Sequence, residues 1–132
     1  MNGLLFVYGS LLSRVRHPMG TRLRREARLL GAATIHGRLY SLGLFPGLVE
    51  AADSPYPVHG EVYDLRMPAT SLKWLDEYEG IVPGKRERSP YERVERPVCL
   101  VAGGTATAWV YLYRKGVRTR PEVTGGYWLP PS

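Results

Sequence analysis

Cysteine is almost absent from this chain of 132 residues, which contains only Cys99. A single cysteine cannot form an internal disulfide, so a disulfide-stabilised scaffold is excluded. Because Cys99 lies inside the apolar run at residues 98–101, we expect its thiol to be buried in the core. The three histidines, His17, His36 and His59, show no metal-ligand spacing with this cysteine. The sequence therefore predicts no metal site.

Long hydrophobic segments are also missing. The first apolar run, residues 4–8, is too short to cross a membrane, and it lacks the basic leader and cleavage region of a signal peptide. We therefore expect a cytoplasmic protein without membrane contact. Apolar residues make up 44% of the chain and charged residues 23%, as in an ordinary globular protein. At this length we expect one domain over residues 1–132, with an irregular tail at residues 114–132.

Acidic residues are scarce relative to basic ones, since 12 Asp and Glu face 18 Lys and Arg and leave a net charge of +6. Six arginines fall between Arg14 and Arg28, where Glu26 is the acidic residue that opposes them. A basic face of this kind attracts nucleic acid or small anions. A solvated surface, with the arginine enrichment that a GC-rich genome produces, explains the same pattern and is the favoured interpretation. Nucleic-acid binding is the alternative.

The pattern of apolar residues predicts an α+β domain. Continuous or alternating apolar residues indicate strands at residues 4–8, 32–40, 58–64, 92–101 and 105–114. Helices are indicated at residues 17–30 and 68–80, the second with Pro68 in its first turn and Gly80 at its end. Turns rich in Gly and Pro, such as Phe45-Pro46-Gly47, separate the strands. Several strands with two short helices imply a strongly curled mixed β-sheet or a small β-barrel.

One acidic residue breaks the amphipathic pattern of the helix predicted at residues 68–80. On a helical wheel the apolar face carries Trp74, Leu75 and Tyr78, and the solvent face carries Asp76 and Glu77. Glu79 lies at the edge of the apolar face and at the helix C-terminus, where the helix dipole disfavours a negative charge. Burial and the dipole both raise the pKa of such a carboxyl group, which makes Glu79 a candidate proton acceptor. The alternative is a solvated glutamate, or one that pairs with a cation from Lys85, Arg86 and Arg88.

A glycine ends the first predicted strand in the sequence Tyr8-Gly9-Ser10-Leu11. Glycine at this point allows a tight turn and a close approach to a ligand, and successive free N–H groups can bind a carboxylate or a phosphate. The spacing is neither that of a nucleophile elbow nor that of a Walker loop. By itself the turn is a candidate anion-binding site.

Taken in order, these segments resemble the gamma-glutamylcyclotransferase-like superfamily, including its gamma-glutamylamine cyclotransferase and avirulence-induced-protein-like branch. The segments that carry the resemblance are Phe6-Val7-Tyr8-Gly9-Ser10-Leu11, Gly37-Arg38-Leu39-Tyr40, Phe45-Pro46-Gly47-Leu48-Val49, Gly60-Glu61-Val62-Tyr63, Leu75-Asp76-Glu77-Tyr78-Glu79-Gly80, Tyr91-Glu92-Arg93 and Gly126-Tyr127-Trp128. The resemblance implies the fold of that superfamily and a catalytic role for Glu79. It also implies a substrate site at Tyr8, Gly9, Ser10, Leu11 and Tyr91.

The resemblance further implies a reaction. The α-amine of a γ-glutamyl compound attacks its own γ-carbonyl group and releases 5-oxoproline together with an amine or amino acid, without a metal or an organic cofactor. Leu11 stands where the glutathione-degrading branch has an asparagine, which favours the gamma-glutamylamine branch, and Tyr127 stands where an acidic residue is usual. The alternative function is a module that binds a small molecule or nucleic acid without turnover. The sequence leaves the oligomeric state and the leaving amine open.

Overall fold

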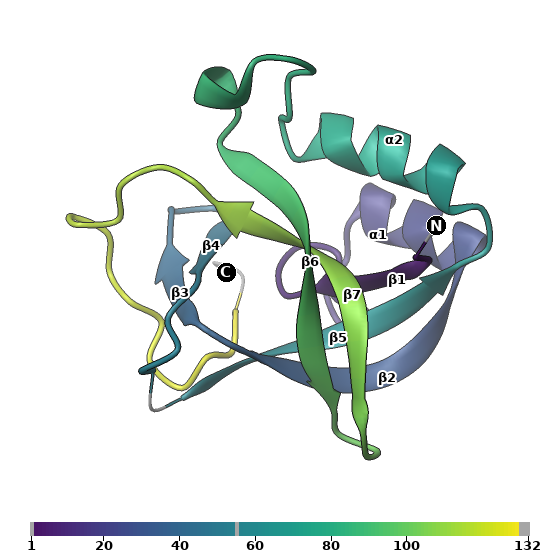
Figure 1. The fold of residues 1–132 in the computed structure, drawn as a ribbon, viewed down its shortest axis with the longest axis horizontal. Coiled ribbons are helices and arrows are strands. Elements are labelled where there is room, and N and C mark those ends of the chain that lie inside the picture. The colour runs from purple at the N-terminus through teal and green to yellow at the C-terminus, as the bar shows by residue number, and fades with distance from the viewer. Residues whose placement is uncertain (1, 55, 130–132) are drawn as a thin grey trace.

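Five strands close into a small barrel in the computed structural model, which describes residues 2–54 and 56–129 (Figure 1). The strands are β1 (Leu4–Val7), β2 (Ala27–His36), β5 (Pro57–Leu65), β6 (Tyr91–Leu100) and β7 (Thr105–Tyr113). They are hydrogen-bonded in the order β1-β5-β2-β6-β7, and these neighbours are antiparallel. The barrel closes where Leu5 of β1 pairs in parallel with Trp109 of β7. A mixed barrel is one of the two architectures that the sequence predicted.

The described residues also form two α-helices, α1 (Pro18–Glu26) and α2 (Pro68–Tyr78), which lie on the β1 side of the barrel (Figure 1). The prediction for α2 is confirmed, and Gly80 follows it with a φ of +78° that favours glycine. The prediction for residues 17–30 is wrong at its C-terminal end. There β2 begins at Ala27, which pairs with Leu65 of β5. Strand pairing outweighs the helical periodicity, and Leu30 is left 40% exposed.

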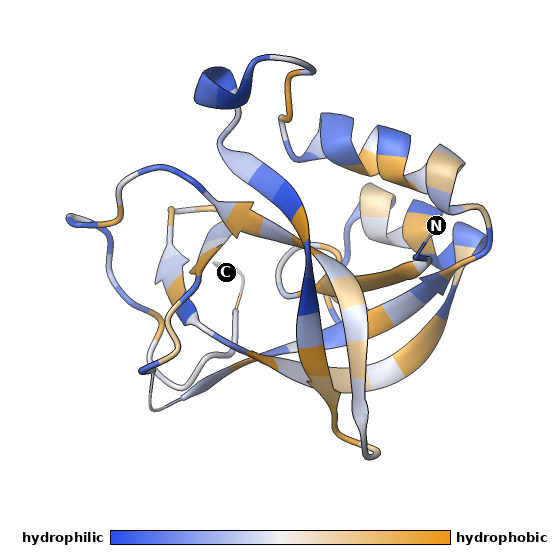
Figure 2. Cartoon of the chain, in the orientation of Figure 1, coloured by the Kyte–Doolittle hydropathy of each residue, from blue (hydrophilic) through white to orange (hydrophobic). Residues whose placement is uncertain are grey.

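Apolar side chains pack in two clusters, one within the barrel and one between the barrel and the helices. Strand β1 contributes to both, because successive side chains of a strand point to opposite faces. Phe6 packs with Val62 and Val110 in the first cluster, and Leu5 packs with Leu75 of α2 in the second. Figure 2 shows this division on α2, which is apolar toward the barrel and polar on its outer side. The last turn of α2 is thereby held against the barrel.

The prediction of a buried Cys99 is wrong, because this side chain is exposed. Its neighbour Val98 is buried in the barrel core. Since side chains alternate along β6, the thiol that follows Val98 points to the outside. A short apolar run does not reveal which of its residues face inward.

A second, two-stranded sheet lies beside the barrel and contacts β7. In it β3 (Arg38–Ser41) pairs with β4 (Pro46–Val49) in antiparallel register. The strand predicted at residues 32–40 is therefore divided, and most of the predicted turn Phe45-Pro46-Gly47 belongs to β4. The division falls at Gly37, where an added Cβ would lie 2.8 Å from the carbonyl oxygen of Val49. Such a close approach of two backbones requires glycine.

The remaining segments are irregular. A 3₁₀ helix, η1 (Arg86–Arg88), lies in the loop between α2 and β6. Residues 114–129 contain neither a helix nor a strand, although Tyr40 and Glu122 form an isolated bridge between this segment and β3. Within residues 2–54 and 56–129, no helix has the length and apolar character needed to cross a membrane.

Candidate active site

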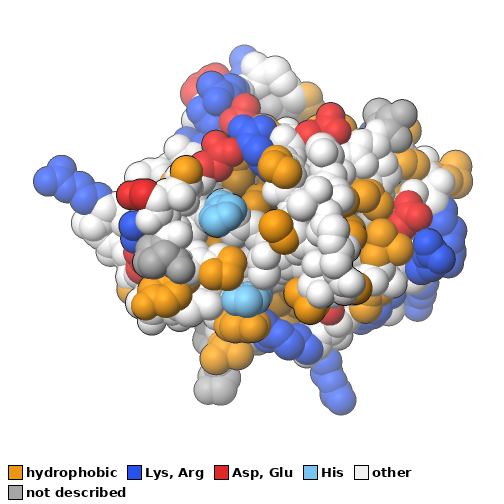
Figure 3. Space-filling model, turned by 60° about the horizontal axis from the view of Figure 1, so that its bottom comes forward, with side chains coloured by type: hydrophobic (Ala, Val, Ile, Leu, Met, Phe, Trp, Pro, Cys, Tyr) orange, Lys and Arg blue, Asp and Glu red, His pale blue; other side chains and the backbone are white. Residues whose placement is uncertain are grey.

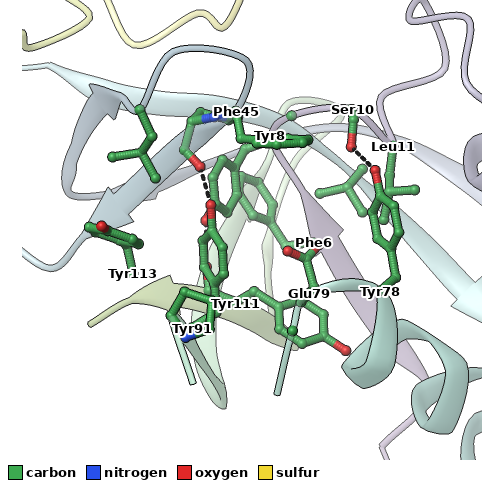
Figure 4. Close-up of a pocket in the computed structure, with 16 residues that line it drawn as sticks. Phe6, Tyr8, Ser10, Leu11, Phe45, Tyr78, Glu79, Tyr91, Tyr111 and Tyr113 are labelled. Atoms are coloured by element: carbon green, nitrogen blue, oxygen red, sulfur yellow. Dashed lines mark hydrogen bonds between the residues drawn. The ribbon is translucent and has the colours of Figure 1, made fainter. Parts of the chain in front are cut away.

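A cavity of about 380 Å³ opens at one end of the barrel. Its walls come from the end of β1 and the loop after it, from β4, from the last turn of α2, and from β6 and β7. The six site residues predicted from the sequence all line it: Tyr8, Gly9, Ser10, Leu11, Glu79 and Tyr91. Figure 4 shows the carboxyl group of Glu79 among aromatic side chains that come from several of these elements. The fold thus brings together residues that are far apart in the chain.

Glu79 is the C-cap residue of α2, and its main-chain N–H group donates to the carbonyl oxygen of Leu75 at 2.9 Å. Burial raises the pKa of its carboxyl group to about 7, and the nearby charge of Asp76 adds to this effect. An ion pair with the loop cations is not found among the described residues, where Arg86 instead pairs with Glu92 at 3.1 Å. A carboxyl group with this pKa exchanges protons readily near neutral pH.

Asp76 was predicted to face solvent, and this prediction is wrong. Its carboxylate accepts hydrogen bonds from Nε of Arg93 at 2.8 Å and from the hydroxyl of Tyr111 at 2.7 Å. Both partners belong to barrel strands that lie under the last turn of α2, and these strands partly cover the helix face that carries Asp76. Glu77 is exposed as predicted. This partly buried ion pair places a negative charge next to Glu79.

Two tyrosines form rigid walls of the cavity. The hydroxyl of Tyr8 donates to the carbonyl oxygen of Tyr111 at 2.5 Å and accepts from the main-chain N–H of Leu48 at 3.3 Å. The hydroxyl of Tyr91 donates to the carbonyl oxygen of Pro46 at 2.7 Å. Burial raises the pKa of both phenols above the ordinary value. Their protons are therefore committed to main-chain acceptors, and the two residues hold β4 and β7 in place.

The loop after β1 presents unused hydrogen-bond donors. The described residues place no main-chain acceptor against the N–H groups of Gly9, Ser10 and Leu11, whereas the carbonyl oxygen of Gly9 accepts from Leu12 at 3.0 Å. Gly9 also packs closely on β4, since an added Cβ would lie 2.8 Å from Cγ of Pro46. Successive free N–H groups of this kind form a site for an anion.

Sequence reasoning missed several residues of the cavity. Tyr78 contributes a hydroxyl that lies 2.6 Å from Oγ of Ser10 (Figure 4). Tyr111, Tyr113 and Pro46 form further parts of the wall. The sequence placed Tyr78 on the apolar face of the helix. Its position next to Glu79 was the signal that could have assigned it to the site. The others come from β4 and β7, and the sequence did not indicate that these strands meet.

The basic residues near α1 were predicted to form a solvated face. Several of them make contacts within the protein: Arg22 pairs with Glu26 at 3.1 Å, Arg28 pairs with Asp64 at 3.9 Å, and Arg14 donates to the carbonyl oxygen of Trp128. On the face that Figure 3 shows, Lys and Arg side chains lie in separate groups around the margin rather than in one continuous surface. In the part of the chain that the structure describes, no three His, Cys, Asp or Glu residues are grouped so that they could hold a metal ion.

Comparison with known sequences identifies the class to which this barrel and cavity belong. Residues 5–130 match the family described as gamma-glutamyl cyclotransferase, AIG2-like. The chain therefore belongs to this family, and the resemblance found in the sequence is confirmed.

Individual relatives agree with this assignment. The chain is 34% identical over 127 residues to the gamma-glutamylcyclotransferase family protein YtfP of Escherichia coli K12, covering 95% of each chain. It is also 34% identical over 131 residues to a protein of Vibrio cholerae, covering 97% of this chain and 96% of the other.

Solved structures share the fold. The solution structure of ytfP from Escherichia coli superposes with a TM-score of 0.66 at 33% identity, covering 96% of each chain. The crystal structure of an AIG2-like protein from mouse superposes with a TM-score of 0.69 at 19% identity, covering 89% of this chain and 80% of the other. At that lower identity the likeness concerns the fold alone.

Proposed function

We propose that the protein is a cyclotransferase that converts a γ-glutamyl compound into 5-oxoproline and a free amine or amino acid. The observation that carries the proposal is the position of Glu79. Its carboxyl group, with a pKa of about 7, shares one cavity with the free N–H groups of Gly9, Ser10 and Leu11. Membership of the gamma-glutamyl cyclotransferase family supports the same class of reaction.

In this proposal the loop after β1 binds the α-carboxylate of the substrate. Among the described residues that line the cavity there is no lysine, arginine or histidine. Main-chain N–H groups and hydroxyl groups are therefore the donors that the cavity offers to a carboxylate. The rings of Tyr8 and Tyr91 enclose the glutamyl chain and favour a bent conformer, in which the α-amine already lies close to the γ-carbonyl carbon.

Ring closure needs a proton acceptor, because the α-amine is protonated at neutral pH and cannot attack in that form. Glu79 accepts a proton, the amine nitrogen bonds to the γ-carbon, and the bond from that carbon to the leaving nitrogen breaks. Over the whole cycle the α-ammonium group loses two protons and the leaving nitrogen gains two. Glu79 passes them on and ends as it began, so the reaction consumes no oxidant and no further reactant.

A panel of γ-glutamyl amines and γ-glutamyl amino acids, assayed for release of 5-oxoproline, tests the proposal. We expect the purified protein to release 5-oxoproline from at least one member of the panel. Binding of 5-oxoproline without turnover of any member would instead support the binding module.

The pH dependence of the rate tests the role of Asp76. Since Glu79 must be ionised to accept a proton, we expect kcat/KM to fall as the pH drops below about 7. Asp76→Asn removes a negative charge that raises the pKa of Glu79, so this acid limb is expected to move to lower pH by about one unit. The amide can still accept from Tyr111. Glu77→Gln removes an exposed charge from the same helix and should leave the limb in place. An acid limb at the same pH in Asp76→Asn contradicts this assignment.

A methyl group at Gly9 tests the anion site. The added Cβ would lie 2.8 Å from Cγ and 3.0 Å from Cδ of Pro46, whose ring cannot turn away. In Gly9→Ala the loop must therefore shift, and we expect KM to rise roughly tenfold because the N–H groups leave their positions. Gly116→Ala is the matched control, since nothing lies within 4 Å of its added Cβ. An unchanged KM in Gly9→Ala would place the carboxylate elsewhere.

A further inference from the structure

A chain of three polar side chains runs from the start of α1 to the cavity. Nε2 of His17 lies 3.3 Å from the hydroxyl of Tyr78, and this hydroxyl lies 2.6 Å from Oγ of Ser10. The rings of His17 and Tyr78 also meet edge to face, with centroids 5.4 Å apart. Both Tyr78 and Ser10 line the cavity, whereas His17 is not among the residues that line it. His17 therefore reaches a ligand only through the other two.

The helix start fixes which nitrogen of His17 carries the proton. His17 is the N-cap residue of α1, and its Nδ1 accepts a hydrogen bond from the main-chain N–H of Met19 at 3.1 Å. A nitrogen that accepts this bond has no proton of its own. In a neutral imidazole the proton then resides on Nε2, so Nε2–H is the donor toward Tyr78.

The direction of the hydrogen bond between His17 and Tyr78 decides whether a hydroxyl proton of Tyr78 or Ser10 remains available in the cavity. With Nε2–H as donor, the Tyr78–Ser10 bond uses one of the two hydroxyl protons, and the other remains free to point at a ligand. With Nε2 as an acceptor, Tyr78 would donate to His17 and Ser10 would donate to Tyr78. No hydroxyl proton would then remain, and the Tyr78–Ser10 pair would present only lone pairs to an anion.

We propose that His17 is a positioning residue for a ligand carboxylate, because its Nε2–H group holds Tyr78 so that one hydroxyl proton of the Tyr78–Ser10 pair points into the cavity. That this carboxylate is the α-carboxylate of a γ-glutamyl substrate rests on the proposed function. The added donor lies next to the free N–H groups of the loop after β1, so hydroxyl and main-chain donors converge on one anion.

The test separates the helix cap from the contact with Tyr78. Asparagine is a good N-cap, so His17→Asn keeps an acceptor for Met19 but is too short to reach Tyr78. We expect its unfolding midpoint to match that of the wild type. Binding of 5-oxoproline, followed by NMR titration, should weaken by roughly three- to tenfold because a donor to a charged group is lost. Binding of 2-pyrrolidinone, the same ring without a carboxylate, should be unchanged.

Two further measurements distinguish positioning from a general structural effect. In the double variant His17→Asn with Tyr78→Phe, binding of 5-oxoproline should be no weaker than in Tyr78→Phe alone, because His17 acts through Tyr78. Long-range ¹H–¹⁵N correlation spectra of the wild type should show His17 protonated on Nε2. A proton on Nδ1, equal binding of 5-oxoproline by the wild type and His17→Asn, or equal weakening for both ligands would overturn the proposal.

The results of these experiments also distinguish failure of the positioning role of His17 from failure of the proposed function. Release of 5-oxoproline by the wild type, with unchanged binding in His17→Asn, refutes the positioning role alone. Carboxylate binding that depends on His17, without turnover of any γ-glutamyl compound, refutes the cyclotransferase and supports the positioning role. Failure of the wild type to bind 5-oxoproline at millimolar concentration overturns the carboxylate site and with it the role of His17.

Discussion

Glu79→Gln is expected to lower the rate of 5-oxoproline release by roughly 10²- to 10⁴-fold, the usual loss on removing a general acid–base group. Glutamine has the same shape as glutamate and keeps the cavity filled, but it cannot accept a proton from the α-ammonium group. The decrease should appear in kcat rather than in KM, because the carboxylate acts on the reacting nitrogen and not on the groups that bind the substrate. Steady-state kinetics on the best substrate of the panel measures both constants.

The control for this variant is Glu77→Gln, an exposed position on the same helix, which should retain the wild-type rate. Folding provides a second control. The pKa of Glu79 is raised from its ordinary value of 4.5 to about 7 in the folded protein. Its ionisation therefore lowers the stability as the pH rises from about 4.5 to about 7, and the full penalty remains at higher pH. At pH 8 Glu79→Gln is therefore expected to be at least as stable as the wild type, and the loss of rate cannot be ascribed to unfolding. An unchanged rate would remove Glu79 from the chemistry.

Gly60→Ala is expected to lower the free energy of unfolding by about 3 kcal/mol, from the overpacking of a buried site. An added Cβ would lie 2.2 Å from the carbonyl oxygen of Val7 and 2.6 Å from Cζ of Phe6. The first contact is with backbone of β1, which is held in register by its pairing with β5. No side-chain rotation can relieve it, so the two strands must separate. Phe6 also lines the cavity, and its displacement should weaken ligand binding as well.

Urea unfolding, followed by circular dichroism, measures this change. A loss of about 3 kcal/mol is a large share of the stability of an ordinary domain. Gly116→Ala is the matched control, because its added Cβ meets nothing within 4 Å, and it should unfold at the wild-type midpoint. Equal midpoints for Gly60→Ala and the wild type would contradict the prediction, and would show that β1 and β5 can move apart at little cost in stability.

The local pattern of residues was sufficient to predict a strand, helix or turn whose structure depends mainly on its own residues. Residues 105–108 alternate between polar and apolar side chains, residues 109–113 continue as an apolar and aromatic run, and the segment forms β7 almost as predicted. Helix α2 was predicted from its apolar face, its proline and the glycine after it, and Glu79 was recognised because it departs from that pattern. The turn after β1 was recognised from its glycine. These features depend on residues that are close in the chain.

Long-range packing explains what the sequence did not reveal. The pairing of β4 with β3 exists only in the fold, so Pro46 and Gly47 were assigned to a turn. Asp76 was assigned to solvent because a helical wheel does not show that Arg93 and Tyr111 lie beneath the last turn of α2. For the same reason the chain from His17 through Tyr78 to Ser10 was not predicted, since its members come from three separate segments.

The parallel contact between Leu5 and Trp109 has a consequence for how the protein is made. During synthesis on the ribosome the first strand emerges long before either of its neighbours, β5 and β7. Until β7 has been translated and docked, β1 lacks one neighbour, and the wall that Tyr111 and Tyr113 provide is missing. Pairings between distant segments of this kind fold slowly. Ligands should therefore bind only after the last strand has joined the barrel, and a nascent chain that ends before residue 105 should have no binding site.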